Sequence, residues 1–145
     1  MSAMGYLIDT NMLVYAYQDK GGCRQRLEAQ AAHGLHICPL TVFEIEFGIA
    51  KSTRPKALRL FLDDVLARYT FAPFTAPAAS QAGQLRAQLE RKGPPIGPYD
   101  LLIAGIALAH DLTVVTRNVR EFLRVPGLQV ENWFDEQISA VAHTK

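Results

Sequence analysis

The sequence predicts an α/β fold in which a mostly parallel sheet carries helices on both of its faces. Short apolar segments of strand length alternate with longer segments of helical periodicity. This alternation is typical of parallel sheets, because each parallel connection needs a crossover. The chain has 145 residues, of which 49% are hydrophobic and 20% charged, as in an ordinary globular protein.

We expect one domain over residues 1–145, because neither an internal repeat nor a long linker divides the chain. Its core should span about 5–134, followed by a tail at 135–145. In the first half, glycines at 21, 22 and 34 mark helix ends. The elements expected there, in order, are a strand at 6–8, helices at about 11–17 and 23–33, a strand at 36–38, helices at about 42–51 and 56–67, and a strand at 70–72.

The second half is expected to begin with a helix at about 78–91, whose small and apolar residues recur at helical spacing. The proline- and glycine-rich segment 93–98 cannot be helical and should form a rigid loop. The segment 99–110 is the most apolar helix and should be buried on several sides. A buried strand at 112–115 and an edge strand at 128–131 complete the expected sheet.

Composition excludes several classes of protein. The net charge is only +1, so no large basic field indicates non-specific DNA binding. Cys23 and Cys38 form no CxxC motif, which favours free thiols in a reducing cytoplasm. The four histidines show no metal-ligand spacing. We expect neither a membrane-spanning segment nor a secretory signal.

The first expected strand ends abruptly at Asp9, which is followed by Thr10 and Asn11. In open α/β sheets, ligands bind beyond the carboxyl ends of the strands, so Asp9 is a candidate site residue. The alternative is that Asp9 or Thr10 only caps the next helix, since both residue types are favoured at that position.

Other polar residues lie near further junctions between strands and helices. Thr41 and Glu44 fit a capping box, which is the structural alternative for Glu44. Glu46 should point about half a turn away from Glu44. Asp100 lies in the first turn of a helix, where it could merely complement the helix dipole. Asn118 could be a simple turn residue.

If the sheet is parallel, these junctions gather at one of its ends. Carboxylates brought together there would repel one another unless a cation lay between them. Oxygen ligands without histidine or thiolate favour magnesium or manganese, which can activate water and neutralise charge on a phosphoryl oxygen. The pattern therefore suggests metal-assisted phosphodiester hydrolysis.

Four segments together resemble the PIN-domain toxins of the VapC family, over Tyr6 to Trp133. They are YLIDTN, LTVFEIEFG, GPPIGPYDLLIAGIALAHDLTVVTRN and REFLRVPGLQVENW. The resemblance implies a three-layer α/β/α sandwich, Mg²⁺- or Mn²⁺-dependent endoribonuclease activity on RNA, transfer RNA among the candidates, and a place in the bacterial cytoplasm. It also implies a homodimer that a VapB-type antitoxin neutralises. We expect Phe43, Ile45 and Phe47, near Phe61 and Leu62, to contribute apolar surface to such interfaces.

The family's three acidic positions fall on Asp9, Glu44 and Asp100. Asp9 and Asp100 would be the main metal ligands, and Glu44 would hold a metal-bound water. Thr10, Asn11 and Thr116 fall on positions that orient the acids or the waters, with Asn11 expected to hydrogen-bond the Asp9 carboxylate.

One departure concerns the fourth acid of many PIN domains, which is Asn118 in this chain. A neutral ligand favours one well-held metal over two. Glu121 could restore the missing charge, or it could be a surface residue paired with Arg117 or Arg124; both readings stay open.

Basic residues around the expected cleft are candidates for RNA phosphate contacts, although each could equally lie on a solvated helix face. They are Arg86, Arg91, Lys92, Arg117 and Arg120.

Three alternatives were weighed. A haloacid-dehalogenase-like phosphatase needs a second aspartate where Asn11 stands, and a lysine at a later strand end. A phospho-acceptor receiver domain needs paired acids after the first strand and a late lysine, where Arg117 and Asn118 stand. A catalytically silent PIN fold would serve only protein contacts, and the acids at 9, 44 and 100 argue against it.

Overall fold

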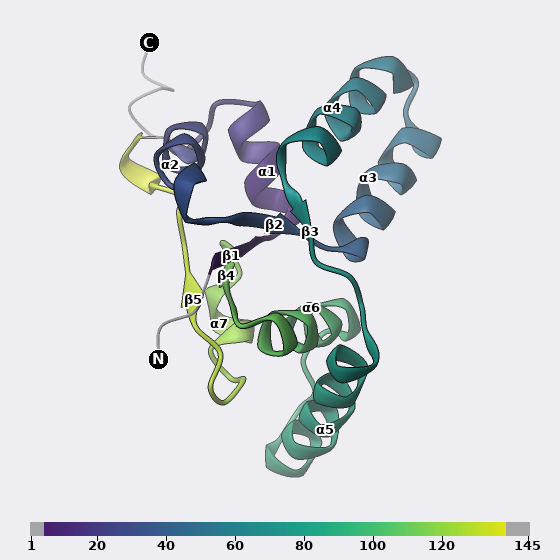
Figure 1. The fold of residues 1–145 in the computed structure, drawn as a ribbon, viewed down its shortest axis with the longest axis vertical. Helices are drawn as coiled ribbons and strands as arrows, with labels where there is room; N and C mark the ends of the chain where they lie inside the picture. Colours follow the sequence, from purple (N-terminus) through teal and green to yellow (C-terminus); the bar gives the residue numbers. More distant parts are fainter. Residues whose placement is uncertain (1–4, 139–145) are drawn as a thin grey trace.

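The computed structural model describes residues 5–138, and a five-stranded sheet in the order β3-β2-β1-β4-β5 runs through its centre (Figure 1). Every neighbouring pair of strands is parallel, which confirms the expected sheet. The strands are β1 (Gly5–Ile8), β2 (Leu35–Ile37), β3 (Thr70–Phe71), β4 (Leu112–Val115) and β5 (Val130–Glu131).

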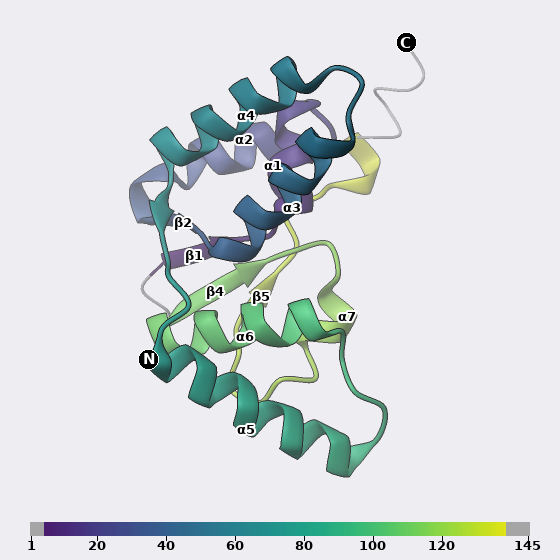
Figure 2. The same ribbon diagram turned by 90° about the vertical axis from the view of Figure 1, so that its right-hand side faces the viewer.

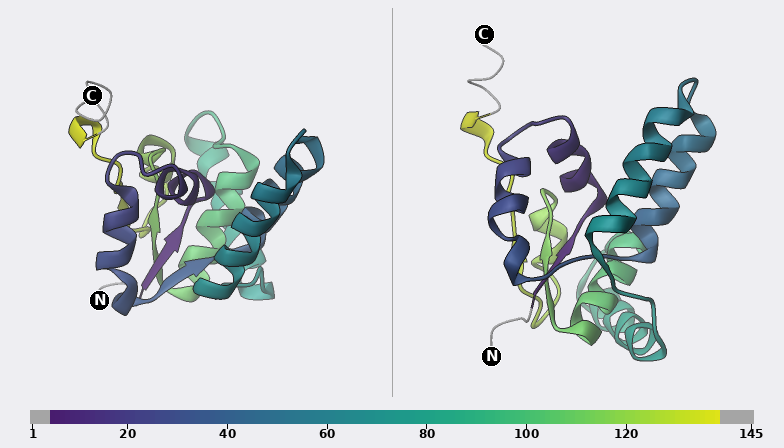
Figure 3. Two further views of the ribbon diagram at one scale, coloured as in Figure 1. Left: turned by 90° about the horizontal axis from the view of Figure 1, so that it is seen from above. Right: turned by 45° about the horizontal axis from the view of Figure 1, so that its top comes forward.

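Helices cover both faces of the sheet, so the fold has the three layers that the sequence predicted (Figures 1 and 2). One face carries α1 (Thr10–Tyr17), α2 (Cys23–Ala29), α3 (Pro39–Lys51) and α4 (Pro55–Arg68). The other face carries α5 (Ala76–Lys92), α6 (Pro98–His110) and the short α7 (Val119–Phe122). Seen from above, the pair of α3 and α4 projects to one side of the sheet (Figure 3).

The apolar core is divided between these faces because successive strand residues point to opposite sides. Leu7 and Val114 pack with α5 and α6, whereas Ile8 and Val115 pack with α1 to α4. The central strands β1 and β4 are thus buried on both sides, as expected for a parallel sheet.

Two helix ends differ from the sequence prediction by three residues or more, whereas α4, α5 and α6 differ by one or two, and Pro98, expected in the rigid loop, is the first residue of α6. The helix expected over 23–33 ends at Ala29, and a separate 3₁₀ turn, η1 (Ala31–His33), follows it. Gly34, at φ 83°, therefore ends the 3₁₀ turn rather than an α-helix. Helix α3 begins three residues before the expected start at 42, at Pro39, because proline suits the first helical position, where no intrahelical N–H is needed.

Both cysteines are free and buried, as the sequence predicted. Burial raises the pKa of the Cys23 thiol to about 11, which makes it unreactive at neutral pH. Within residues 5–138, no helix combines the length and apolar character needed to cross a membrane.

Helices α5 and α6 approach each other closely at Gly105. A Cβ atom added at Gly105 would lie 2.6 Å from the Ala78 carbonyl oxygen and 2.9 Å from the Ala82 Cβ. By contrast, nothing lies within 4 Å of a Cβ added at Gly83, on the exposed side of α5. The small residue at 105 sets the distance between the two helices.

We therefore expect Gly105→Ala to lower the free energy of unfolding by about 1–3 kcal/mol, since it overpacks a backbone contact. Gly83→Ala, the matched control, should raise it by about 0.5–1 kcal/mol, because alanine favours the helix. Urea denaturation measures both. A Gly105→Ala protein as stable as Gly83→Ala would contradict the close packing.

Candidate functional site

The polar residues that follow β1 and β4 meet at one edge of the sheet. Ile8 and Val115, the last residues of these strands, are register partners, so Asp9 and Thr116 emerge side by side. The buried Thr116 hydroxyl donates a hydrogen bond of 2.9 Å to Asp9 Oδ2 and accepts one of 3.0 Å from the Asn118 backbone N–H. Asp9 makes no side-chain bond that caps α1. Its carboxylate is held by Thr116 and is not a helix cap.

Glu44, on α3, is held by Thr10, which follows the end of β1. Thr10 Oγ1 lies 3.0 Å from Glu44 Oε1 and 3.1 Å from Thr41 Oγ1. Since an ionised carboxylate can only accept, Thr10 donates to Glu44 and the Thr41 hydroxyl donates to Thr10. The expected capping box is wrong, because α3 starts at Pro39 with Cys38 as its N-cap. Thr41 therefore lies inside the helix, where its buried hydroxyl supports the site, a role the sequence prediction missed.

Asp100, in the first turn of α6, is held from the β4 side. The side-chain amide of Asn118 donates to Asp100 Oδ2 over 3.1 Å. Asn118 was expected as a turn residue or a neutral ligand, and its amide N–H orients the carboxylate of Asp100. Its position at the start of α7 carries no side-chain cap bond.

The carboxylates of the site are partly buried and repel one another. Burial raises the pKa of Asp9, against the Thr116 hydroxyl and the Thr10 backbone N–H, which lower it. Burial also raises the pKa of Glu44, and the charges of Asp9 and Asp100 raise it further, against the Thr10 bond. For Asp100, burial raises the pKa most, followed by the charges of Asp9 and Glu121, while the Asn118 bond lowers it. The four acids form one electrostatically linked group.

Glu121 belongs to this group and is not a paired surface residue. Its Oε2 is buried and has no hydrogen-bond partner within residues 5–138. Neither expected partner is engaged with it: Arg117 pairs with Glu136, and Arg124 bonds the Pro94 carbonyl. Since a buried unpaired carboxylate oxygen is costly, its position favours a ligand or water as partner.

The role expected for Asn11 is wrong. Its side chain is exposed, and no hydrogen bond joins it to Asp9 among the residues that the structure describes. Successive helix positions point in different directions, so the buried Thr10 turns toward the sheet edge and Asn11 turns outward.

Of the basic residues expected to contact RNA phosphates, some form ion pairs within the protein and others do not. Arg117 forms an ion pair with Glu136 and stacks on Phe134, so it holds the segment that follows β5 against the rest of the protein. Arg86 pairs with Glu90 one turn along α5. Within the described part of the chain, no ion pair engages the remaining three, which are Arg91, Lys92 and Arg120.

The residues at the sheet edge fit a hard divalent cation. The atoms that could bind a metal there are carboxylate, hydroxyl and amide oxygens, the ligand set that Mg²⁺ and Mn²⁺ prefer. Across residues 5–138, no three carboxylate, imidazole or thiolate groups converge closely enough to enclose an ion by themselves. Magnesium commonly takes only one or two carboxylates directly and keeps several waters. The spread of the acids therefore suits a cation held partly through water.

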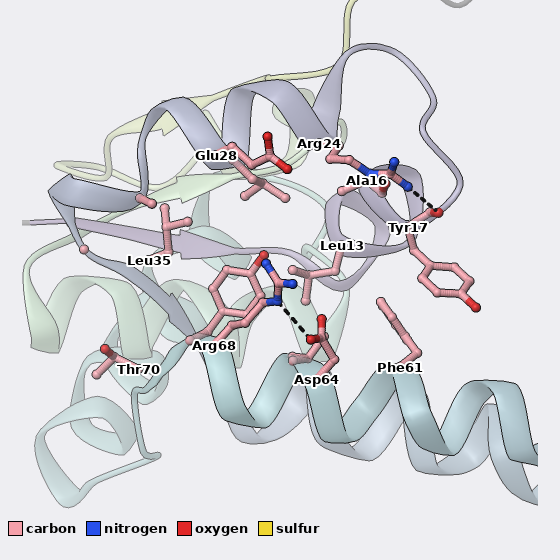
Figure 4. Close-up of a pocket in the computed structure, with 15 residues that line it drawn as sticks. Leu13, Ala16, Tyr17, Arg24, Glu28, Leu35, Phe61, Asp64, Arg68 and Thr70 are labelled. Carbon is pink, nitrogen blue, oxygen red and sulfur yellow. Dashed lines mark hydrogen bonds and ion pairs between the residues drawn. The ribbon is translucent and has the colours of Figure 1, made fainter.

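A pocket of about 560 Å³ lies away from the sheet edge, between α1, α2 and α4 (Figure 4). Figure 4 shows that the apolar Leu13 and Phe61 and the charged Arg24, Glu28 and Arg68 line this pocket together. None of the sheet-edge carboxylates lines it. The pocket thus has no part in the chemistry of those acids.

Comparisons with known proteins agree on the family. The model of the PIN domain matches residues 6–128. Ribonuclease VapC2 of Rickettsia felis is 38% identical over 132 residues, covering 90% of this chain and 98% of the relative. The tRNA(fMet)-specific endonuclease VapC of Salmonella typhimurium is 36% identical over 129 residues, covering 88% and 97%.

Solved structures agree with these sequence matches. The crystal structure of VapBC2 from Rickettsia felis bound to a promoter DNA fragment contains a similar chain, at TM-score 0.82 and 36% identity. The match covers 90% of this chain and 99% of that one. DNA-bound VapBC from Salmonella typhimurium gives a TM-score of 0.81 at 34% identity, covering 90% and 98%.

Crowded acids make the cation-free site a source of instability, so Asp9→Asn should raise the melting temperature in EDTA. An acid whose folded pKa is raised destabilises the fold above that pKa, and this penalty disappears as pH falls through it. The gain should therefore shrink at acidic pH. The control is Glu46→Gln, which removes an exposed acid paired with Arg59 and should give no rise. A lower melting temperature for Asp9→Asn at pH 7 would contradict the electrostatic account.

Proposed function

Because the chain belongs to the PIN-domain family and to its VapC ribonucleases, we propose that it is an endoribonuclease toxin of a bacterial toxin–antitoxin pair. The observation that carries the proposal is the group formed by Asp9, Glu44 and Asp100, each held by a hydroxyl or amide donor at the sheet edge. A phosphatase of the haloacid-dehalogenase type is disfavoured, because the residue two places after Asp9 is the exposed Asn11.

We further propose that the enzyme requires Mg²⁺ or Mn²⁺, with Asp9 and Asp100 as its principal ligands. When bound, the cation neutralises charge on the phosphate and lowers the pKa of water. Thr116 and Asn118 each hold one oxygen of these ligands, and among the described residues no side-chain hydrogen bond engages the second oxygen of either carboxylate. This arrangement explains why neutral donors, and not lysines or arginines, hold the acids.

Glu44 is suited to accept a proton from the attacking water. Thr10 occupies its Oε1, so Oε2 is the oxygen left to act. Water, and no side chain of the protein, is the nucleophile in this proposal.

The partners follow from the relatives, whose structures are VapBC complexes. We propose a VapB-type antitoxin that places an Arg or Lys near Asp9 and Asp100, where a cation replaces the metal. We also propose a homodimer in the bacterial cytoplasm. Ile45, Phe61 and Leu62 are buried in the core and cannot form its interface, in contrast to the sequence prediction. Phe43 and Phe47 are exposed, as that prediction requires, and so is Leu60.

Cleavage of RNA should require a divalent cation and leave 5′-phosphate and 3′-hydroxyl ends, because water attacks phosphorus and the P–O3′ bond breaks, with the 3′-oxygen leaving and taking up a proton. Asp9→Asn and Asp100→Asn should each reduce the rate by at least about 100-fold, and Glu46→Gln should not. Mapping of RNA ends after induction of each variant, and with purified protein in EDTA, measures this. Cleavage by a folded Asp9→Asn protein, or 2′,3′-cyclic ends formed in EDTA, would contradict the mechanism.

The number of cations depends on positions 118 and 121. We expect the wild-type chain to bind one Mn²⁺ tightly. The Glu121→Gln variant should bind Mn²⁺ more weakly, because it loses the negative charge of the Glu121 carboxylate. Asn118→Asp should bind Mn²⁺ more tightly, since it adds a charge to the site. Calorimetry on RNA-free protein measures both, with Glu46→Gln as the unaffected control. Two tight sites that survive Glu121→Gln would show that the fourth acid has no role.

A further inference from the structure

We propose that Phe43 and Tyr99 form a stacking platform for an unpaired base of the RNA next to the cleaved phosphodiester. The inference rests on the proposed function, since it names the form of substrate that the carboxylate site accepts. It assigns a binding role to two residues that the chemistry of the acids does not use.

The two rings form an aromatic pair between α3 and α6. Their centroids lie 5.6 Å apart, with an angle of 62° between the ring planes. Each side chain is 51% exposed. The edge-to-face contact fixes the orientation of both rings, while about half of each remains accessible.

This pair differs from the other aromatic pairs in residues 5–138, each of which has a buried ring. Trp133, Phe134 and Phe61 supply these buried rings. Those pairs therefore contribute to the core. Phe43 and Tyr99 are instead both about half exposed, which is characteristic of an interaction surface.

The position of the Phe43–Tyr99 pair next to the site acids indicates that RNA is the molecule that binds it. Phe43 directly precedes Glu44 and Tyr99 directly precedes Asp100. Glu44 is bonded to Thr10, and Asp100 is bonded through Asn118 to the segment that holds Asp9. The platform thus joins the two helices that carry site acids. A polynucleotide with a phosphate at the acids would have its adjacent bases within reach of these rings.

The chemistry favours an unpaired base over a base pair. Bases stack on aromatic side chains when they are splayed out of a strand or loop, and every base offers a π-face. A duplex hides those faces. We therefore assign to Phe43 and Tyr99 one or two unpaired bases beside the cut, held by stacking.

The test uses Asp9→Asn protein, which binds RNA without cutting it, and an oligonucleotide spanning a mapped cleavage site. Tyr99→Ala and Phe43→Ala should each weaken binding about 5- to 150-fold, the range of one lost base–aromatic contact. Tyr99→Phe keeps the ring and should recover most of the affinity lost in Tyr99→Ala. The matched control is Tyr17→Ala, which removes a tyrosine of similar exposure, 55%, at the far end of α1.

A second arm replaces single nucleotides beside the cut by abasic residues. If the base stacks on Tyr99, removing the base and removing the ring should be non-additive, because both delete the same contact. Additive losses at every position, or affinity unchanged by Tyr99→Ala and Phe43→Ala, would overturn the platform. A change in dimerisation measured by sedimentation, without a change in RNA affinity, would also overturn it. The proposed nuclease function would survive these results as long as cleavage still required Asp9.

Discussion

The structure depends on the pairing of β1 with β4 at the centre of an all-parallel sheet. This pairing brings Asp9 and Thr116 out of adjacent strand ends and buries the hydroxyl that holds the carboxylate. A carboxylate withdrawn from water is costly unless donors replace the lost hydration. Threonine hydroxyls and one asparagine amide provide those donors, each to one oxygen of its acid. They orient the acids without neutralising them.

Within residues 5–138, no lysine or arginine forms an ion pair with Asp9, Glu44 or Asp100, and this has a functional consequence. A lysine or arginine beside Asp9 or Asp100 would stabilise the fold but would occupy the position that a cation needs. The chain instead leaves the acids unpaired: burial raises the pKa values of Asp9, Glu44 and Asp100, and repulsion from neighbouring acids raises those of Glu44 and Asp100 further. The same repulsion supplies affinity for a divalent ion and, in our proposal, for the basic side chain of an antitoxin. Stability is thus exchanged for binding at this edge of the sheet.

The sequence was sufficient for the fold and for the gathering of Asp9, Glu44 and Asp100 at one edge of the sheet, whereas the expectation for Thr116 came from the resemblance to VapC toxins. Short apolar strands alternating with helices define the parallel sheet, and strand ends define where Asp9 and Thr116 lie. The details that failed depend on tertiary contacts. Whether Thr41 caps a helix depends on where α3 begins, and Pro39 moved that start by one turn. Whether Asn11 or Thr116 holds Asp9 depends on which residue faces inward. The pairing of Phe43 with Tyr99 joins helices 56 positions apart in the chain, which periodicity cannot show.

The acids at the sheet edge form one electrostatically linked group, and a bound cation would reduce the repulsion between them. The most direct measurement is a pH titration of the carboxyl carbons by NMR, in ¹³C-labelled protein, first in EDTA and then in Mg²⁺. The account predicts raised pKa values for Asp9, Glu44 and Asp100 in EDTA, and a fall of these values when Mg²⁺ is added. Ordinary pKa values in EDTA, or values that Mg²⁺ leaves unchanged, would contradict it.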